Sequence, residues 1–122
     1  MPKFSKQSLD RLATCHPDLQ RLMHAVIRRV DITILCGHRG ETEQNAAFAN
    51  HTSQLKWPKG KHNKLPSLAV DIAPYPVDWN NVQRFKDVAE IVKQEATDLD
   101  IDIEWGGDWH SIVDLPHWQL KI

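Results

Sequence analysis

Hydrophobic residues recur along this chain with two different spacings. Apolar positions three and four residues apart predict helices, whereas short β-branched runs and strict alternation predict strands. The helical spacing predicts four helices, over residues 5–14, 18–30, 41–49 and 82–97. The other patterns predict four strands, over residues 32–36, 68–73, 101–105 and 117–120. The last two strands are too close in sequence for a helical crossover and should be antiparallel, so we predict an α+β fold.

Individual residues set the expected helix boundaries and faces. Ser5 or Ser8 is a candidate N-cap of the first helix, in which Leu9, Leu12 and Ala13 have helical spacing. Pro17 suits the first turn of the second helix. The buried stripe of that helix should comprise Leu19, Leu22, Met23, Val26, Ile27 and Val30. The buried stripe of the helix over 82–97 should comprise Val82, Phe85, Val88, Ala89, Val92 and Ala96.

Length and composition narrow the class of protein. A chain of 122 residues can bury one modest core, so we predict a single domain over residues 1–122, and we expect a monomer. The formal net charge of −1 gives no electrostatic reason to expect nucleic acid or an anionic membrane as a partner. The N-terminal residues lack the apolar run of a signal peptide, so we expect the chain to begin in the cytoplasm. Two cysteines, Cys15 and Cys36, are too few for a disulfide framework, and we interpret both as reduced.

One carboxylate interrupts the apolar run over residues 68–73. Burying Asp71 is costly unless it binds a cation or is well hydrogen-bonded. Asp71 is therefore a metal ligand, the partner of a buried arginine, or part of a polar strand face. The third option arises because Ala69, Asp71 and Ala73 share one side of the strand. Two small residues beside an acid would leave room for an ion and a substrate.

The segment 104–118 is unusually rich in Trp, His and acidic residues. The part of it most able to carry chemistry is Asp114-Leu-Pro-His117. We predict that His117 holds a metal ion together with His62 and Asp71. Two nitrogens and one oxygen suit Zn²⁺ and leave a position open for water, as in catalytic sites. The pKa of such a water falls to about 7. Asp114 would accept its proton and pass it to the leaving amine.

Arg39 follows a predicted strand and precedes a predicted helix, a common place for a side chain to point into a cleft. There it could polarise a scissile carbonyl or bind a substrate carboxylate. Alternatively, it is a surface residue that pairs with Glu41 or Glu43. The loop over residues 51–61 carries Lys56, Lys59 and Lys61, which either attract an anionic substrate or serve only as solubilising charge.

Three motifs in this order resemble the LAS/M15 zinc metallopeptidases. They are the segment from Lys61-His62 to Asp71-Ile-Ala-Pro-Tyr75, Trp105-Gly-Gly-Asp-Trp109, and Asp114-Leu-Pro-His-Trp118. A fourth segment, Gly37-His-Arg-Gly-Glu-Thr-Glu-Gln44, is similar to the family's arginine-bearing turn and glutamine-bearing helix. The resemblance covers residues 5–120 and is greatest to phage endolysins that act as L-alanyl-D-glutamate peptidases. It implies the hedgehog-like metallopeptidase fold, with a short, mainly antiparallel sheet and about four flanking helices.

The resemblance also implies roles for single residues. Zinc ligands would be His62, Asp71 and His117, the catalytic base Asp114, and the substrate- or oxyanion-stabilising group Arg39, with Gln44 in substrate binding. Relatives that cleave D-alanyl-D-alanine usually have Glu where this chain has Asp114. They also have fewer than the eight residues that separate His62 from Asp71 here. Both departures favour the endolysin-like subgroup. The resemblance assigns no role to the Trp105–Trp109 segment.

The predicted function is hydrolysis of the L-alanyl-D-glutamate bond in peptidoglycan stem peptides, leading to cell-wall degradation and host lysis. The alternatives are a D-alanyl-D-alanine carboxypeptidase of the same fold and a non-catalytic wall-binding module. We expect no separate wall-binding domain, no stable membrane association and no nucleic-acid partner. From the host cytoplasm, the protein would reach the wall through a separate pore.

Overall fold

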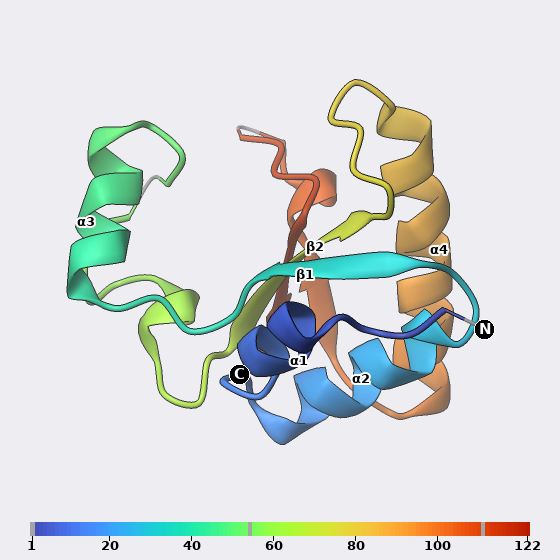
Figure 1. Cartoon of the computed structure of the whole chain (residues 1–122). Helices are drawn as coiled ribbons and strands as arrows, with labels where there is room; N and C mark the ends of the chain where they lie inside the picture. Colours follow the sequence, from blue (N-terminus) through green and yellow to red (C-terminus); the bar gives the residue numbers. More distant parts are fainter. Residues whose placement is uncertain (1, 54, 111) are drawn as a thin grey trace.

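A computed structural model describes residues 2–53, 55–110 and 112–122 (Figure 1). Within these residues the chain forms four α-helices and a four-stranded sheet, so the predicted α+β class is confirmed. The helices are α1 (Lys6–Leu12), α2 (Pro17–Ile27), α3 (Glu41–Ala49) and α4 (Val82–Asp98). The strands are β1 (Ile32–Cys36), β2 (Ala69–Pro74), β3 (Ile103–Trp105) and β4 (His117–Leu120). Two short 3-10 turns, η1 (Lys61–Asn63) and η2 (Gly106–Asp108), complete the described elements.

The strands lie in the order β1-β2-β4-β3, and each neighbouring pair is antiparallel. The predicted antiparallel pairing of the last two strands is therefore confirmed. Asp71 of β2 lies opposite His117 of β4, and Glu104 of β3 lies opposite Gln119. This register brings residues that are far apart in the sequence to neighbouring positions at the centre of the sheet.

One face of the sheet packs against helices. Side chains from α1, α2 and α4 form a single apolar core with the strand residues Ile32, Ile34, Val70, Ile72, Trp118 and Leu120. Strand side chains alternate between the two faces, so the residues between these point the other way. That second face carries Ala69, Asp71 and Ala73, as predicted, together with His117. We call it the site face.

Helix α3 lies apart from the other helices, on the left of Figure 1. Its apolar residues do not form a buried stripe, and Gln44 is its one buried side chain among the described residues. Helix α3 therefore owes its position to polar contacts near the site rather than to the core.

None of the helices in the described ranges is both long and apolar enough to cross a membrane.

Three predicted helix faces or ends need correction. In α1, Leu9 is exposed and Ser8 is buried instead, because the Ser8 hydroxyl meets Thr33 and accepts a hydrogen bond from the Ile34 amide. Helix α2 ends at Ile27, three residues earlier than predicted. Val82 is exposed because it is the first residue of α4 and comes soon after an exposed segment, residues 75–80.

Candidate metal centre

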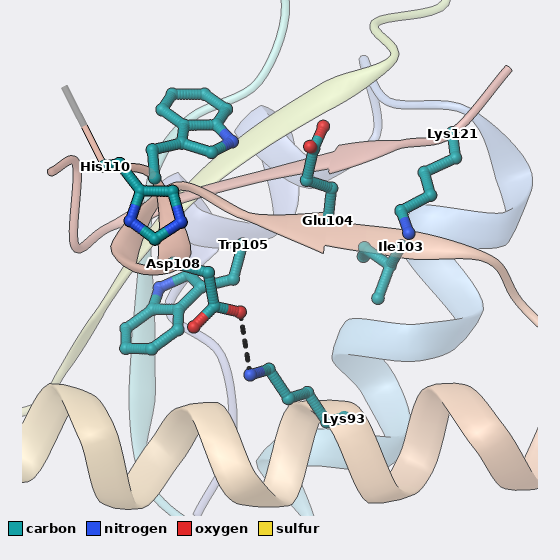
Figure 2. A pocket seen from close by; sticks show the side chains of 8 residues that line it. Lys93, Ile103, Glu104, Trp105, Asp108, His110 and Lys121 are labelled. Carbon is teal, nitrogen blue, oxygen red and sulfur yellow. Dashed lines mark hydrogen bonds and ion pairs between the residues drawn. The ribbon is translucent and has the colours of Figure 1, made fainter. Parts of the chain in front are cut away.

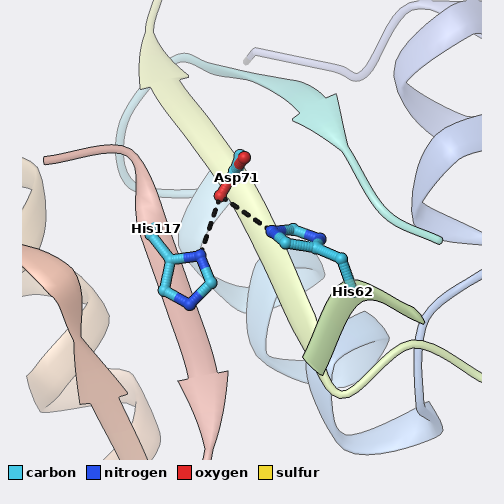
Figure 3. Close-up of side chains that lie close together, drawn as sticks. All are labelled: His62, Asp71 and His117. Carbon is cyan, nitrogen blue, oxygen red and sulfur yellow. Dashed lines mark hydrogen bonds and ion pairs between the residues drawn. The ribbon is translucent and has the colours of Figure 1, made fainter. Parts of the chain in front are cut away.

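Three side chains converge on the site face (Figure 3). His62 Nε2 and His117 Nδ1 each lie 3.2 Å from the same carboxylate oxygen, Asp71 Oδ1. The three potential ligand atoms all lie within 4.8 Å of one another. His62 comes from η1, Asp71 from β2 and His117 from β4, so the sheet register and one loop bring the three predicted ligands together.

The second nitrogen of each imidazole is also bonded. His62 Nδ1 lies 2.7 Å from the carbonyl oxygen of Gly37, which can only accept a hydrogen bond. His117 Nε2 lies 2.8 Å from Gln119 Oε1. If these nitrogens carry the protons, the neutral rings direct their lone pairs at Asp71 Oδ1. Two lone pairs and a carboxylate oxygen repel one another unless a cation lies between them.

The electrostatics of the site show the same need for positive charge. Although burial lowers it, hydrogen bonding to Asp71 raises the pKa of His62 to about 10. Although burial raises it, hydrogen bonds from His117 and His62 hold the pKa of Asp71 well below its usual range. In the absence of metal, a proton on His62 adds positive charge beside the carboxylate.

The residues present fit a zinc ion. Zn²⁺ accepts imidazole nitrogen and carboxylate oxygen at about 2.0–2.2 Å, and tetrahedral ligands at that distance lie roughly 3.4 Å apart. The two 3.2 Å separations at Asp71 Oδ1 are close to this spacing. Zinc-bound histidines typically donate their other N–H to a fixed acceptor, as both rings can do here.

Asp114 lies beside this group, one turn of chain before His117. Its amide donates to Gly106 O at 3.0 Å, and its carbonyl accepts from the His117 amide at 3.2 Å. Burial, and next the negative charge of Asp71, raise the pKa of Asp114. A Cβ at Gly106 would collide with the backbone of Asp114 and crowd His117, so only glycine permits this close approach.

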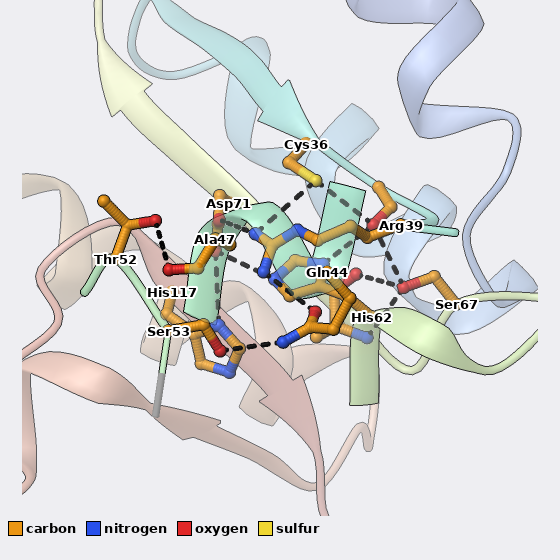
Figure 4. A network of polar contacts seen from close by, with 12 residues as sticks. Cys36, Arg39, Gln44, Ala47, Thr52, Ser53, His62, Ser67, Asp71 and His117 are labelled. Carbon is orange, nitrogen blue, oxygen red and sulfur yellow. Dashed lines mark hydrogen bonds and ion pairs between the residues drawn. The ribbon is translucent and has the colours of Figure 1, made fainter. Parts of the chain in front are cut away.

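The guanidinium of Arg39 points at the carboxylate of Asp71 (Figure 4). Its Nη2 lies 3.5 Å from Asp71 Oδ2, and its Nη1 donates to Gln44 Oε1 at 3.1 Å. Among the described residues its ion pair is with Asp71, so the alternative of a surface pair with Glu41 or Glu43 is wrong. Asp71 is thus both a candidate ligand and the partner of a largely buried arginine.

Gln44 lies beneath Arg39 rather than at the surface. It is 1% exposed, its Oε1 also accepts from Asn63 at 3.1 Å, and its Nε2 donates to Ser53 at 2.8 Å and to the Leu55 carbonyl. All its hydrogen-bonding capacity is used within the protein. In this conformation Gln44 connects α3 and the following loop to Arg39.

Lys61 also differs from both interpretations of the loop lysines. Its ammonium donates to the Leu120 carbonyl at 2.9 Å and so binds the loop to the end of β4. Lys56 lies 5.0 Å from the Phe48 ring centroid, and Lys59 is exposed. Only the structure shows that Lys61 helps to hold η1, and with it His62, against the sheet.

The sequence did not predict that Cys36 or Trp109 lies at the site. A bulge in β1 between Ile34 and Cys36 places Cys36 opposite Asp71, and Arg39 Nη2 lies 3.8 Å from its sulfur. The Trp109 ring centroid lies 5.2 Å from that of His117. Trp105 instead stacks on Trp118 in the core, at 5.6 Å. The Trp105–Trp109 segment therefore divides into a core residue and a wall of the site.

A groove runs beside the candidate metal centre, between β3, η2 and α4 (Figure 2). Its lining residues are Lys93, Ile103, Glu104, Trp105, Asp108, Trp109, His110 and Lys121. Lys93 and Asp108 form an ion pair across it at 2.8 Å. Trp109 borders both the groove and His117, so the groove adjoins the centre without containing it.

Comparisons with known proteins identify the family of this chain. The family model described as phage L-alanyl-D-glutamate peptidase matches residues 1–119. The chain is 36% identical to the L-alanyl-D-glutamate peptidase of Escherichia phage T5 over 98% of its own length and 89% of that protein. Its fold matches the crystal structure of the Serratia marcescens L-Ala D-Glu endopeptidase ChiX with a TM-score of 0.83 and 29% identity, covering 98% of this chain and 90% of the other.

Both sequence and fold therefore lead to one family across nearly the whole chain, as the resemblance of its motifs implied. The predicted arrangement of four helices around an antiparallel sheet is the arrangement found here, and it is shared with a solved endopeptidase. This chain belongs to the phage L-alanyl-D-glutamate peptidase family.

Proposed function

We propose that this protein is a zinc-dependent peptidase that hydrolyses the L-alanyl-D-glutamate bond of peptidoglycan stem peptides. One observation carries the proposal: His62, Asp71 and His117 bring two nitrogens and one oxygen within 4.8 Å of one another, in a chain of this family. The names of the T5 and Serratia relatives support the choice of bond. The metal centre and Asp114 support catalysis over simple wall binding.

His62, Asp71 and His117 would hold the zinc ion, leaving a coordination position for substrate or water. When bound, zinc supplies Lewis-acid activation of water and of a peptide carbonyl. The contacts behind both rings keep the ligands in place, and the largely buried Asp71 limits competing solvent. The chain's own residues then have to move the proton and orient the substrate.

Asp114 would act as the general base and then as the general acid. Its raised pKa makes it a stronger base than an ordinary carboxylate and better able to return the proton. It would take a proton from the attacking water and deliver it to the amine of D-glutamate as the peptide bond breaks. The Gly106 contact holds the backbone of Asp114 close to His117.

Arg39 would stabilise the substrate, either at the scissile carbonyl oxygen or at a substrate carboxylate. Its guanidinium is planar and presents several donors, which suits both tasks. Gln44 would not contact the substrate directly, because its hydrogen bonds are all made within the protein. It would instead hold the guanidinium of Arg39 in position. This makes Gln44 a positioning residue.

The biological role that follows is degradation of the bacterial cell wall and host lysis. In this proposal a monomeric, single-domain enzyme leaves the host cytoplasm through a separate pore and acts on the wall. Membership of a phage peptidase family supports this role.

Digestion of purified peptidoglycan, followed by mass spectrometry, tests the proposal. Zinc-loaded protein should release fragments with a new D-glutamate amino terminus, and a chelator should stop their release. Asp114→Asn should abolish cleavage while zinc stays bound, whereas the exposed Asp102→Asn should behave like the wild type. Release of D-alanine instead would identify a carboxypeptidase, and wall binding without cleavage would identify a binding module; either result overturns the proposal.

A further inference from the structure

A chain of three side chains leads from the groove to the metal centre. Glu104 of β3 and Gln119 of β4 lie directly opposite each other, and His117 precedes Gln119 by two residues on the same face. Gln119 Nε2 donates to Glu104 Oε1 at 2.8 Å, and Gln119 Oε1 lies 2.8 Å from His117 Nε2. We call these three residues the relay.

The relay has a defined polarity because its ends differ chemically. A carboxylate only accepts hydrogen bonds, so Glu104 requires the NH₂ group of Gln119 to face it. The Gln119 oxygen must then face His117 and can only accept. Nε2 of His117 therefore keeps a proton, and Nδ1, which lies 3.2 Å from Asp71 Oδ1, is the nitrogen that can give up its proton to a metal ion.

The other histidine does not depend on side chains in this way. His62 Nδ1 faces the backbone carbonyl of Gly37, whose polarity cannot be reversed. A glutamine amide can turn over and exchange its oxygen for its nitrogen. If Gln119 turned over, its NH₂ group would face His117 Nε2, and the proton would move to Nδ1, where it would block the metal.

We propose that Glu104, which touches neither the metal ligands nor the reacting atoms, is a positioning residue that sets the tautomer of His117 through Gln119. The proposal rests on the metal site of the proposed function but not on the bond that is cleaved. The neighbours of the relay permit this arrangement. Gln119 lies opposite Ala69, whose small side chain leaves room for the amide, and Glu104 borders the groove beside Trp109.

The test is the affinity for Zn²⁺, measured by competition with a chromophoric chelator. Outer-shell partners of metal-bound histidines typically contribute about 10–100-fold to affinity. Glu104→Gln should weaken zinc binding about 10-fold, because an amide at 104 no longer dictates the orientation of Gln119. The matched control Asp102→Asn also removes one acidic group close to β3, but outside the relay, and should leave the affinity unchanged.

A double substitution tests polarity directly. In Glu104→Gln combined with Gln119→Glu, a carboxylate at 119 accepts from His117 and the amide at 104 donates to it. Zinc affinity should return to within about 3-fold of the wild type. This remaining loss is smaller than the roughly 10–100-fold loss expected when such a partner is removed. A purely structural role for Glu104 gives no reason for such rescue.

Nuclear magnetic resonance gives a readout that needs neither metal nor activity. The proton on His117 Nε2 should be visible in ¹H–¹⁵N spectra of wild-type protein, with or without zinc, and should exchange faster in Glu104→Gln. Unchanged zinc affinity and proton exchange in Glu104→Gln would overturn the proposal, as would an equal loss in Asp102→Asn. If the wild type bound no zinc, the proposed function would fail, and the proton readout would still decide the relay.

Discussion

Two adjacent residues of β4 meet opposite surroundings. Trp118 is 1% exposed, stacks on Trp105 and packs into the apolar core. His117 is 9% exposed and contacts Asp71 and Gln119 through directional polar bonds. The same alternation in β2 separates Val70 from Asp71. The sheet therefore divides its two faces between stability and chemistry.

The difference concerns how each face tolerates change. Core contacts are many and non-directional, so their free energy follows the apolar area removed from water. Site-face contacts are few, and each depends on which atom donates and which accepts. Asp71 brings negative charge into a largely buried place, where Arg39 and a proton or metal ion at the two histidines balance it. A change on one face should therefore leave the other largely intact.

The largest expected effect is on the core face. Trp118→Ala removes a fully buried indole and should lower the free energy of unfolding by about 3–5 kcal/mol. Urea denaturation in the presence of a chelator measures this loss without any contribution from zinc. A loss below about 1 kcal/mol would contradict the assignment of Trp118 to the core, since a deletion there ordinarily costs several times more.

The substitution of the neighbouring residue, His117→Ala, should greatly reduce zinc affinity but have a small effect on the free energy of unfolding. It removes a ligand and should weaken zinc binding by more than about 100-fold, beyond the usual effect of an outer-shell partner. In chelator, its unfolding free energy should change much less than that of Trp118→Ala. Competition with a chromophoric chelator and urea denaturation provide the two measurements. Equal losses of stability in both variants would show that the two faces are not independent.

Metal-free protein should lose stability as the pH rises above 6.5. The unfolded state releases the His62 proton near pH 6.5, whereas the folded state keeps it until about pH 10. The folded state binds more protons in this window, so the stability is fully present below 6.5 and falls toward 10, by at most about 1.4 kcal/mol per pH unit.

Thermal unfolding in chelator from pH 6 to 10 measures this dependence, and His62→Gln is the control. The variant should show a weaker decline over the same range. With zinc bound, the ion replaces the proton on His62, so the decline should also weaken. A wild type whose decline matches that of His62→Gln would contradict the proposed balance of charge at Asp71.

The smallest expected effect is a displaced acid limb of activity. Because burial and Asp71 raise the pKa of Asp114, the acid limb of kcat/KM should lie above the ordinary value of 3.8. Asp114 must lose its proton to act as a base, so activity should rise with pH through this limb. The profile is measured at saturating zinc to exclude metal loss. A limb at or below 3.8 would exclude Asp114 as the group that controls it.

Element types were predictable because hydrophobic periodicity is local. The strands at 32–36 and 117–120 and the helix at 41–49 have the predicted bounds. Errors occurred where a tertiary contact overrides local pattern, as with Ser8, which is buried because β1 supplies its hydrogen-bond partners. The edge strand β3 begins two residues later than predicted, at Ile103.

At the site, the sequence indicated chemical types better than contacts. His62, Asp71 and His117 were candidates because a carboxylate in an apolar run and an Asp-x-x-His segment both require an explanation. Glu104 and Gln119 lie on predicted strands, at positions that alternate with core residues, and this was the available signal for the relay. Strand periodicity gives the face of each residue but not the partner strand, so the relay could not be assigned from it.

The sequence by itself determined the α+β class, the core residues of α2 and, apart from Val82, those of α4, and the residue types able to hold zinc. Only the tertiary structure decided that Arg39 pairs with Asp71, that Gln44 lies beneath Arg39, and that Glu104 faces Gln119. The physical reason is the sequence distance over which each feature is determined. Burial patterns repeat within one helix or strand, whereas hydrogen-bond partners depend on sheet register, a bulge in β1 and a loop that brings distant residues within about 3 Å of one another.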